Sequence, residues 1–339
     1  MAPRAFITGL AGPVLSPDEK AFFRESDPWG FILFKRNISA PAQVSELTAA
    51  LREAVGRDAP ILVDQEGGRV QRLGPPHWPA YPPGATYARI YQRNKTVGLE
   101  AARLGARLIA YDLAAVGIDV DCLPLADVPV AGSDAVIGDR AYGTDPEQVA
   151  ALAGAAAGGL QEGGVLPVLK HLPGHGRATA DSHLALPTVD ADRATLDRTD
   201  FAAFKPLSAL PLGMTAHVVF SAIDPKHPAT TSATMVREVI RGFIGFQGLL
   251  MSDDVSMGAL SGTLGERSRA ALAAGCDVVL HCNGKREEMD AVAQNSPELA
   301  GEAARRADAA LKARRKPRDF DVIQARARFA VLIGEGGVA

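Results

Sequence analysis

The sequence has few cysteines and no long uninterrupted apolar segment. Its 339 residues contain three cysteines, Cys122, Cys276 and Cys282, an odd number too small for a disulfide framework. Cys122 and Cys276 lie in apolar runs, which favours buried free thiols over a metal site. No stretch reaches the roughly 18 apolar residues that a bilayer-spanning helix needs, and the N-terminus lacks the features of a secretion signal. We therefore expect a cytoplasmic protein that does not bind membranes.

Strong charge and nucleotide-binding motifs are also missing. The formal net charge is −3, which gives no reason to expect a nucleic acid as a partner. No Gly-x-Gly-x-x-Gly turn follows the first apolar run, and no Gly-x-x-x-x-Gly-Lys-Ser/Thr motif occurs, so nothing points to a dinucleotide or phosphate cradle. One basic stretch, Lys312 to Arg318, is interpreted as a solvated helix end and linker.

Short apolar runs alternate with Ala- and Leu-rich segments along the whole chain. The segments 40–54, 97–115, 146–158 and 232–244 suit helices, and Ser232 with Thr231 suits the cap of the last one. Eight strand–helix repeats favour a parallel barrel over a doubly wound sheet. We predict an α/β fold, a single-domain (β/α)8 TIM barrel over residues 1–339 with a C-terminal helix and tail. The predicted strands are 5–8, 30–34, 61–64, 118–122, 166–170, 213–216, 249–252 and 277–281.

Polar residues follow several of these strands directly. In a barrel they converge at the C-terminal face, where such enzymes have their active sites. The richest segment is Lys170 to His183, which holds three of the seven histidines. Pro173, Gly174 and Gly176 prevent a regular helix there and predict a flexible loop. Asp181 and His183 are two residues apart, so in an extended loop the carboxylate can bond the imidazole and favour its protonated, acidic form. A pair that merely braces the loop is the alternative.

Three further segments offer polar side chains at strand ends. The stretch from Asp64 to Arg72 combines two carboxylates, two arginines and a glycine pair, which suits a ligand with many hydroxyls, although a salt-bridged surface turn is the alternative for Glu66 and Arg69. Arg140 suits a carboxylate or ring hydroxyl, and equally an ion pair with Asp139 or Asp145. Asp253 and Asp254 are adjacent, so we expect one of the two to face the barrel mouth.

Together these segments resemble the bacterial β-N-acetylhexosaminidases of glycoside hydrolase family 3, in their single-domain cytoplasmic form. The shared motifs occur in the family's order over some two hundred residues. They are Asp-Gln-Glu-Gly-Gly-Arg-Val-Gln-Arg at 64–72, Ile-Gly-Asp-Arg at 137–140, Lys-His-Leu-Pro-Gly-His-Gly at 170–176, Ala-Asp-Ser-His at 180–183, Met-Thr-Ala-His at 214–217 and Ser-Asp-Asp-Val-Ser-Met at 252–257. Two residues depart from the family pattern, Leu172 and Arg177, and Arg177 lies in the loop.

The resemblance implies a role for each matching residue. Asp253 takes the position of the catalytic nucleophile, His183 that of the acid/base, and Asp181 that of its partner. The positions that hold the N-acetylglucosamine ring are matched by Asp64, Arg72, Arg140, Lys170 and His171. The implied activity is that of a retaining exo-β-N-acetylglucosaminidase that removes terminal N-acetylglucosamine from peptidoglycan fragments during cell-wall recycling, without metal or cofactor. We expect a monomer whose partner is its carbohydrate substrate.

Several alternatives stay open at this point. A metal-dependent hydrolase would use His171, His175, Asp181 and His183 as ligands, although Pro173 and Gly174 exclude the helix on which a His-x-x-x-His pair grips metal well. A phosphorylase is compatible with an Asp–His pair, because histidine repels an incoming phosphate less than a carboxylate does. Chitin fragments are an alternative substrate. A non-catalytic sugar-binding barrel would need a broken catalytic set.

Overall fold

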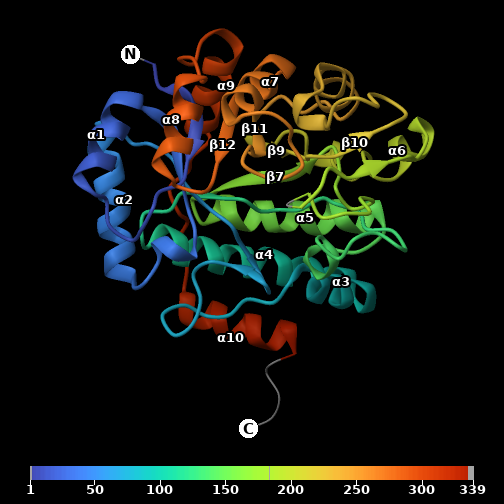
Figure 1. Cartoon of the computed structure of the whole chain (residues 1–339). Coiled ribbons are helices and arrows are strands. Elements are labelled where there is room, and N and C mark those ends of the chain that lie inside the picture. Colours follow the sequence, from blue (N-terminus) through green and yellow to red (C-terminus); the bar gives the residue numbers. More distant parts are fainter. Residues whose placement is uncertain (1, 183, 335–339) are drawn as a thin grey trace.

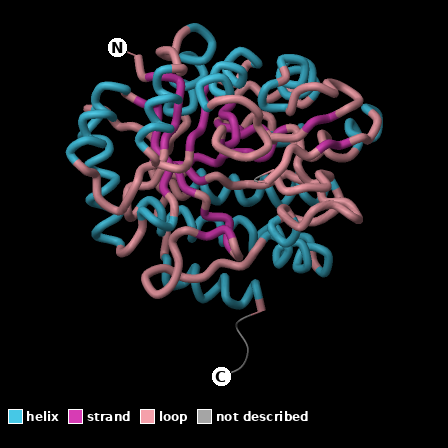
Figure 2. The backbone as a smooth tube through the Cα atoms, in the orientation of Figure 1, coloured by secondary structure: helices cyan, strands magenta, loops and turns pink. Residues whose placement is uncertain are grey.

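Eight parallel strands close into a barrel at the centre of the molecule, with helices around it (Figure 2). The computed structural model describes residues 2–182 and 184–334. The first and last barrel strands pair with each other, with Ile7 opposite Leu280, and this pairing closes the barrel. The predicted (β/α)8 barrel is confirmed. Its strands are β1 (Arg4–Thr8), β2 (Pro28–Leu33), β3 (Ile61–Val63), β6 (Val120–Asp121), β7 (Leu166–Leu172), β9 (Leu212–Thr215), β11 (Leu249–Asp254) and β12 (Val278–His281).

Side chains on the strands alternate between the barrel interior and the surrounding helices. On β1, Ile7 points to the inner apolar cluster, whereas its neighbour Phe6 belongs to the outer one; on β2, Ile32 and Phe31 divide in the same way. Cys122 and Cys276 are buried free thiols, as predicted. The barrel is thus a packed core, and its mouth is where side chains have room to bind a ligand.

Helices cover the outside of the barrel (Figure 1). The predicted helices over 40–54, 97–115 and 146–158 correspond to α2, α4 and α5. Ser232 accepts a hydrogen bond from the amide of Met235 at 3.1 Å, but the segment that follows is a wider π-helix, η5 (Met235–Phe243), after which the amide of Ile244 bonds to the carbonyl of Val239. The helices are α1 (Pro17–Ser26), α2 (Pro41–Val55), α3 (Gly84–Arg93), α4 (Lys95–Ala114), α5 (Pro146–Glu162), α6 (Arg193–Arg198), α7 (Leu264–Ala274), α8 (Arg286–Gln294), α9 (Gly301–Lys312) and α10 (Val322–Ile333).

Two small sheets at the barrel mouth were not predicted. One is the hairpin of β4 (Gln65–Gly67) and β5 (Val70–Gln71); the other pairs β8 (Thr188–Val189) with β10 (Val219–Phe220). The hairpin requires glycine at its turn, because Gly67 has φ +94° and a Cβ there would lie 2.4 Å from the carbonyl oxygen of Pro82. The glycine pair of the Asp64–Arg72 segment therefore shapes the hairpin.

The segment after α9 crosses the N-terminal end of the barrel before α10 packs against α4 (Figure 1). Arg314 binds Asp58 at 2.8 Å and Asp119 at 2.7 Å, two carboxylates that precede β3 and β6. Arg318 lies 3.5 Å from Glu162 at the end of α5. The basic stretch is therefore only partly solvated, because these arginines hold the linker against the barrel.

None of the helices within residues 2–182 and 184–334 combines the length and the apolar composition that a membrane crossing needs.

Candidate active site

A single cavity of about 480 Å³ at the C-terminal ends of the strands collects the predicted site residues. His183 lies outside the described residues. Every other predicted site residue lines this cavity, although the residues come from the ends of four barrel strands, β3, β6, β7 and β11, or from the loops after them. They are Asp64, Arg72, Arg140, Lys170, His171, Asp181 and Asp253.

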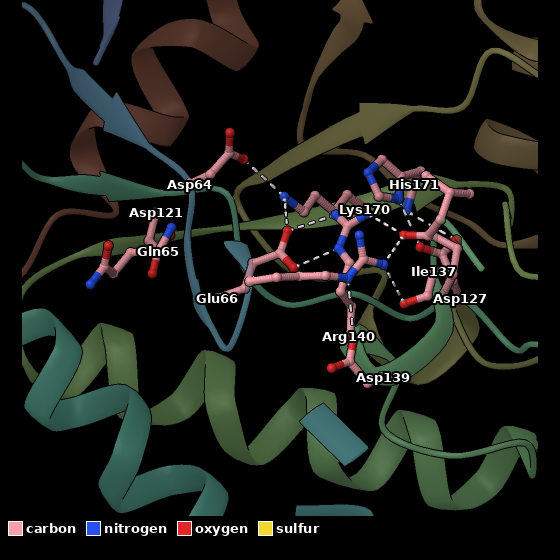
Figure 3. A network of polar contacts seen from close by, with 12 residues as sticks. Asp64, Gln65, Glu66, Asp121, Asp127, Ile137, Asp139, Arg140, Lys170 and His171 are labelled. Atoms are coloured by element: carbon pink, nitrogen blue, oxygen red, sulfur yellow. Dashed lines mark hydrogen bonds and ion pairs between the residues drawn. The ribbon is translucent and has the colours of Figure 1, made fainter. Parts of the chain in front are cut away.

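One side of the cavity is a network of alternating charges around Lys170 (Figure 3). The Nζ atom of Lys170, at the end of β7, lies 3.0 Å from Oδ1 of Asp64 and 2.7 Å from Oε1 of Glu66. Arg72 donates from Nη2 to Oδ2 of Asp64 at 3.0 Å. Arg140 forms a bidentate pair with Glu66, with both bonds at 2.8 Å. Each of these charges is therefore fixed in place by a partner of opposite sign.

The network keeps its members ionised in spite of their burial. Burial alone raises the pKa of Asp64, but Lys170 and Arg72 outweigh it and hold the pKa of this carboxyl well below its usual range. Burial would lower the pKa of Lys170, yet the carboxylates of Glu66 and Asp64 raise it above its ordinary value. The cavity wall thus presents fixed ammonium, guanidinium and carboxylate groups, the set that binds ring hydroxyls through charge-assisted hydrogen bonds.

Of the alternatives left open, the ion pair of Arg140 with Asp139 or Asp145 is not the one that forms, and the surface turn holds for Arg69 but is wrong for Glu66. Asp139 instead lies 3.2 Å from the exposed Arg69, and Asp145 caps α5 by accepting from the amide of Gln148. Glu66 is only 6% exposed and forms the ion pair with Arg140. The spacing of Asp64 and Glu66 indicated that Glu66 faces the same side as Asp64, because residues two apart in an extended chain point to the same side.

Asp127 is a functional residue that the sequence analysis missed. It is fully buried after β6, and its Oδ2 lies 2.7 Å from Nδ1 of His171, while its Oδ1 accepts from the amide of His175 at 2.6 Å. Burial would raise the pKa of Asp127, but the two histidines lower it, so this carboxylate orients the His171 ring and leaves its Nε2 for a ligand. The signal was a carboxylate directly after an apolar run, from Leu123 to Ala126.

The two adjacent carboxylates at the end of β11 have different tasks. Both border the cavity. Asp254 accepts bonds from the amide and hydroxyl of Ser256, at 3.0 and 2.6 Å, and from the amide of Cys282 at 3.2 Å. Asp253 accepts from the amide of Asp254 at 2.8 Å. Asp254 therefore braces the turn, which leaves Asp253 as the candidate for chemistry in the cavity.

A buried histidine, His217, forms a hydrogen bond to the backbone of this turn. Nε2 of His217 donates to the carbonyl oxygen of Asp254 at 2.9 Å, and its Nδ1 lies 2.7 Å from the hydroxyl of Thr230. Burial lowers the pKa of His217, which favours the neutral ring. The histidine of the Met-Thr-Ala-His motif thus holds the backbone carbonyl of Asp254, next to the Asp253 carboxylate.

Two of the four proposed metal ligands, His171 and His175, have other partners in the described chain. Nδ1 of His171 bonds to Asp127, and Nε2 of His175 lies 2.9 Å from the hydroxyl of Ser182. Within residues 2–182 and 184–334, no group of three His, Cys, Asp or Glu side chains is arranged to hold a metal ion. His183, the remaining residue of the proposed set, lies outside these residues.

A parallel barrel with carboxylates at its mouth, beside a wall of fixed charges suited to ring hydroxyls, is the arrangement of a barrel glycoside hydrolase. The family model described as the glycosyl hydrolase family 3 N-terminal domain matches residues 18–312. The chain belongs to this family.

Individual relatives agree with this assignment over most of the chain. A beta-hexosaminidase from Alkalilimnicola ehrlichii is 40% identical over 296 residues, which cover 86% of this chain and 83% of the relative. A beta-hexosaminidase from Pseudomonas aeruginosa is 40% identical over 281 residues, 81% of either chain. Among solved structures, NagZ from Neisseria gonorrhoeae in complex with N-trifluoroacetyl-D-glucosamine superimposes with a TM-score of 0.87 at 31% identity, covering 99% of both chains.

Proposed function

We propose that this glycoside hydrolase is a retaining exo-β-N-acetylglucosaminidase. The observation that carries the proposal is that one cavity brings Asp253 together with the Asp64–Lys170–Glu66–Arg140 wall. The named relatives are beta-hexosaminidases, and the Neisseria structure holds an N-acylated glucosamine. A sugar bound to the charged wall through its hydroxyls would present its anomeric carbon to a carboxylate across the cavity.

The proposed reaction has two steps. Asp253 attacks the anomeric carbon while His183 protonates the leaving oxygen, and a covalent glycosyl-enzyme forms. His183 then removes a proton from the water that releases the sugar. A histidine suits both steps because its ordinary pKa lies near neutrality, and Asp181 orients and tunes it. Asp64, Arg72, Arg140, Lys170 and His171 hold the ring during both steps.

The acid/base role predicts that His183→Ala discriminates between leaving groups. We expect kcat/KM on a disaccharide substrate to fall about 10²- to 10⁴-fold, the usual contribution of a general acid. Glycosylation by a dinitrophenyl glycoside needs no proton and is expected to stay near the wild-type rate in a pre-steady-state burst. The exposed His77 offers a matched control, since His77→Ala is expected to change neither reaction. Equal losses on both substrates would contradict the acid role.

The proposed natural substrate is a peptidoglycan fragment, N-acetylglucosaminyl-1,6-anhydro-N-acetylmuramic acid with or without its peptide, cleaved in the cytoplasm by a monomer. This assignment is supported by the family resemblance, and chitin fragments are the alternative. We expect a higher kcat/KM on the anhydromuramyl disaccharide than on chitobiose, with free N-acetylglucosamine as the product. The reaction is followed by chromatography, with and without phosphate and in the presence of a strong chelator.

Each arm of this experiment tests a different alternative. N-acetylglucosamine 1-phosphate formed with added phosphate would identify a phosphorylase. Activity lost to the chelator and restored by a divalent metal would identify a metal-dependent hydrolase. A preference for chitobiose would transfer the assignment to chitin fragments.

A further inference from the structure

Ser182, the residue between Asp181 and His183 in sequence, is held on two sides by different parts of the barrel mouth. It is only 2% exposed. Its hydroxyl lies 2.9 Å from Nε2 of His175, and its carbonyl oxygen accepts from the amide of Ala259 at 3.2 Å. A serine that uses both its side chain and its backbone in this way fixes the position and the orientation of its segment.

The first anchor, His175, is itself rigidly placed. It is 3% exposed, and its amide donates to Asp127, the carboxylate that also orients His171. The next residue, Gly176, packs so closely on the backbone of Val128 that a Cβ would lie 2.3 Å from its carbonyl carbon. The hydroxyl of Ser182 is therefore connected through His175 to Asp127, the buried carboxylate that also positions the sugar-binding His171.

The second anchor belongs to the connection that follows the candidate nucleophile. Ala259 lies between β11, which ends at Asp254, and α7. It is buried, and the turn before it is braced by Asp254 through Ser256. Ser182 therefore joins the sugar-binding side of the cavity to the nucleophile side.

Other contacts hold the start of the loop independently of Ser182. Arg177 donates from Nε and Nη2 to Oδ2 of Asp200, at 3.0 and 2.9 Å, and Ala178 is buried. Beyond Ser182, Leu184 is 82% exposed, so its side chain adds little packing to hold this end of the loop. The amides of Leu184 and Ala185 donate to the carbonyl oxygen of Asp181 at 3.0 Å, and the Ser182 contacts tie this local turn to the barrel mouth.

We propose that Ser182 is a positioning residue for the acid/base step: its bonds to His175 and Ala259 fix where Asp181, the proposed partner of the acid/base, stands relative to Asp253. The inference rests on the proposed acid/base role of His183. It also gives His175 a structural role. The bond between His175 and Ser182 can be removed by a single substitution of either residue.

The test is the leaving-group dependence of Ser182→Ala in the full-length enzyme. A misplaced catalytic group costs up to about 10²-fold, so we expect kcat on chitobiose to fall about tenfold to hundredfold. The glycosylation burst with the dinitrophenyl glycoside is expected to stay within about threefold, because that step needs no acid. His175→Asn, whose shorter side chain cannot reach the hydroxyl, is expected to give the same pattern. Ser261→Ala removes an exposed serine of the β11–α7 connection and serves as the control.

A double-mutant cycle separates positioning from a merely structural role. If Ser182 acts through His183, Ser182→Ala adds no further loss on chitobiose in the His183→Ala background. Additive losses, equal losses on both substrates, or wild-type kinetics in Ser182→Ala and His175→Asn would overturn the inference. If His183→Ala itself shows no leaving-group dependence, the acid/base proposal fails first, and the two failures are distinguishable.

Discussion

Asp253→Ala is expected to lower kcat by at least about 10⁴-fold, because the loss of the proposed nucleophile removes the proposed covalent path altogether. The side chain borders the cavity at the end of β11, and its neighbour Asp254 is committed to Ser256 and Cys282. No other carboxylate of the β11 turn can therefore replace it without dismantling the turn. The measurement is kcat on chitobiose, with the fold verified by circular dichroism.

Asp254→Asn is the matched control for this substitution. Asparagine keeps the size of the side chain and an oxygen that accepts from Ser256, so we expect a loss of about tenfold, the cost of a weakened hydrogen bond. A 2-fluoro sugar with a good leaving group is expected to trap the glycosyl-enzyme, and peptide mass spectrometry would locate the label on Asp253. A label on Asp254 or Asp181 would refute the assignment.

Lys170→Met is expected to destabilise the protein by about 3–5 kcal/mol, because it leaves Asp64 and Glu66 buried without their shared cation. Lys170 is 2% exposed and contacts both carboxylates. It also borders the cavity, so kcat/KM is expected to fall by at least about 10²-fold as the ring-binding wall collapses. Urea unfolding at pH 7 measures the first effect and steady-state kinetics the second. Lys316→Met, in the exposed linker, is expected to stay within about 0.5 kcal/mol of the wild type.

The stability difference between wild type and Lys170→Met also has a defined pH dependence. The folded-state pKa values of Asp64 and Glu66 are depressed, so their contribution is present above the unfolded pKa of about 4 and is lost as the pH falls through the folded value. Without Lys170 this depression weakens. We therefore expect the difference to be largest above about pH 5 and to shrink at lower pH. A difference that is constant from pH 7 down to about pH 2 would assign the loss to packing instead.

The barrel could be predicted from the sequence because each strand carries its own signal. The runs ending near Asp64, Lys170 and His281 are apolar and short and end in or are followed by polar residues, and a closed parallel barrel brings those ends together. The same logic brought Asp64, Lys170 and Asp253 together before any contact was known.

The pairings inside the site could not be predicted, because they join residues that are distant in sequence. Glu66 and Arg140 are 74 positions apart, and Asp127 and His171 are 44 apart. Local spacing offered Asp139 and Asp145 as partners for Arg140, but Asp139 pairs with Arg69 and Asp145 caps α5. Spacing finds partners within one segment, whereas the register of the barrel decides which segments meet.

The pairing of β1 with β12 has a consequence for the order in which this chain is made. Synthesis runs from the N-terminus, so β1 leaves the ribosome long before the strand that completes its second edge, Val278–His281. During that interval the backbone amides and carbonyls of Ala5–Thr8 on this edge have no strand beside them, and such edges promote association with other nascent chains. The edge of β1 thus stays open to other chains until Val278–His281 has been made and has closed the barrel.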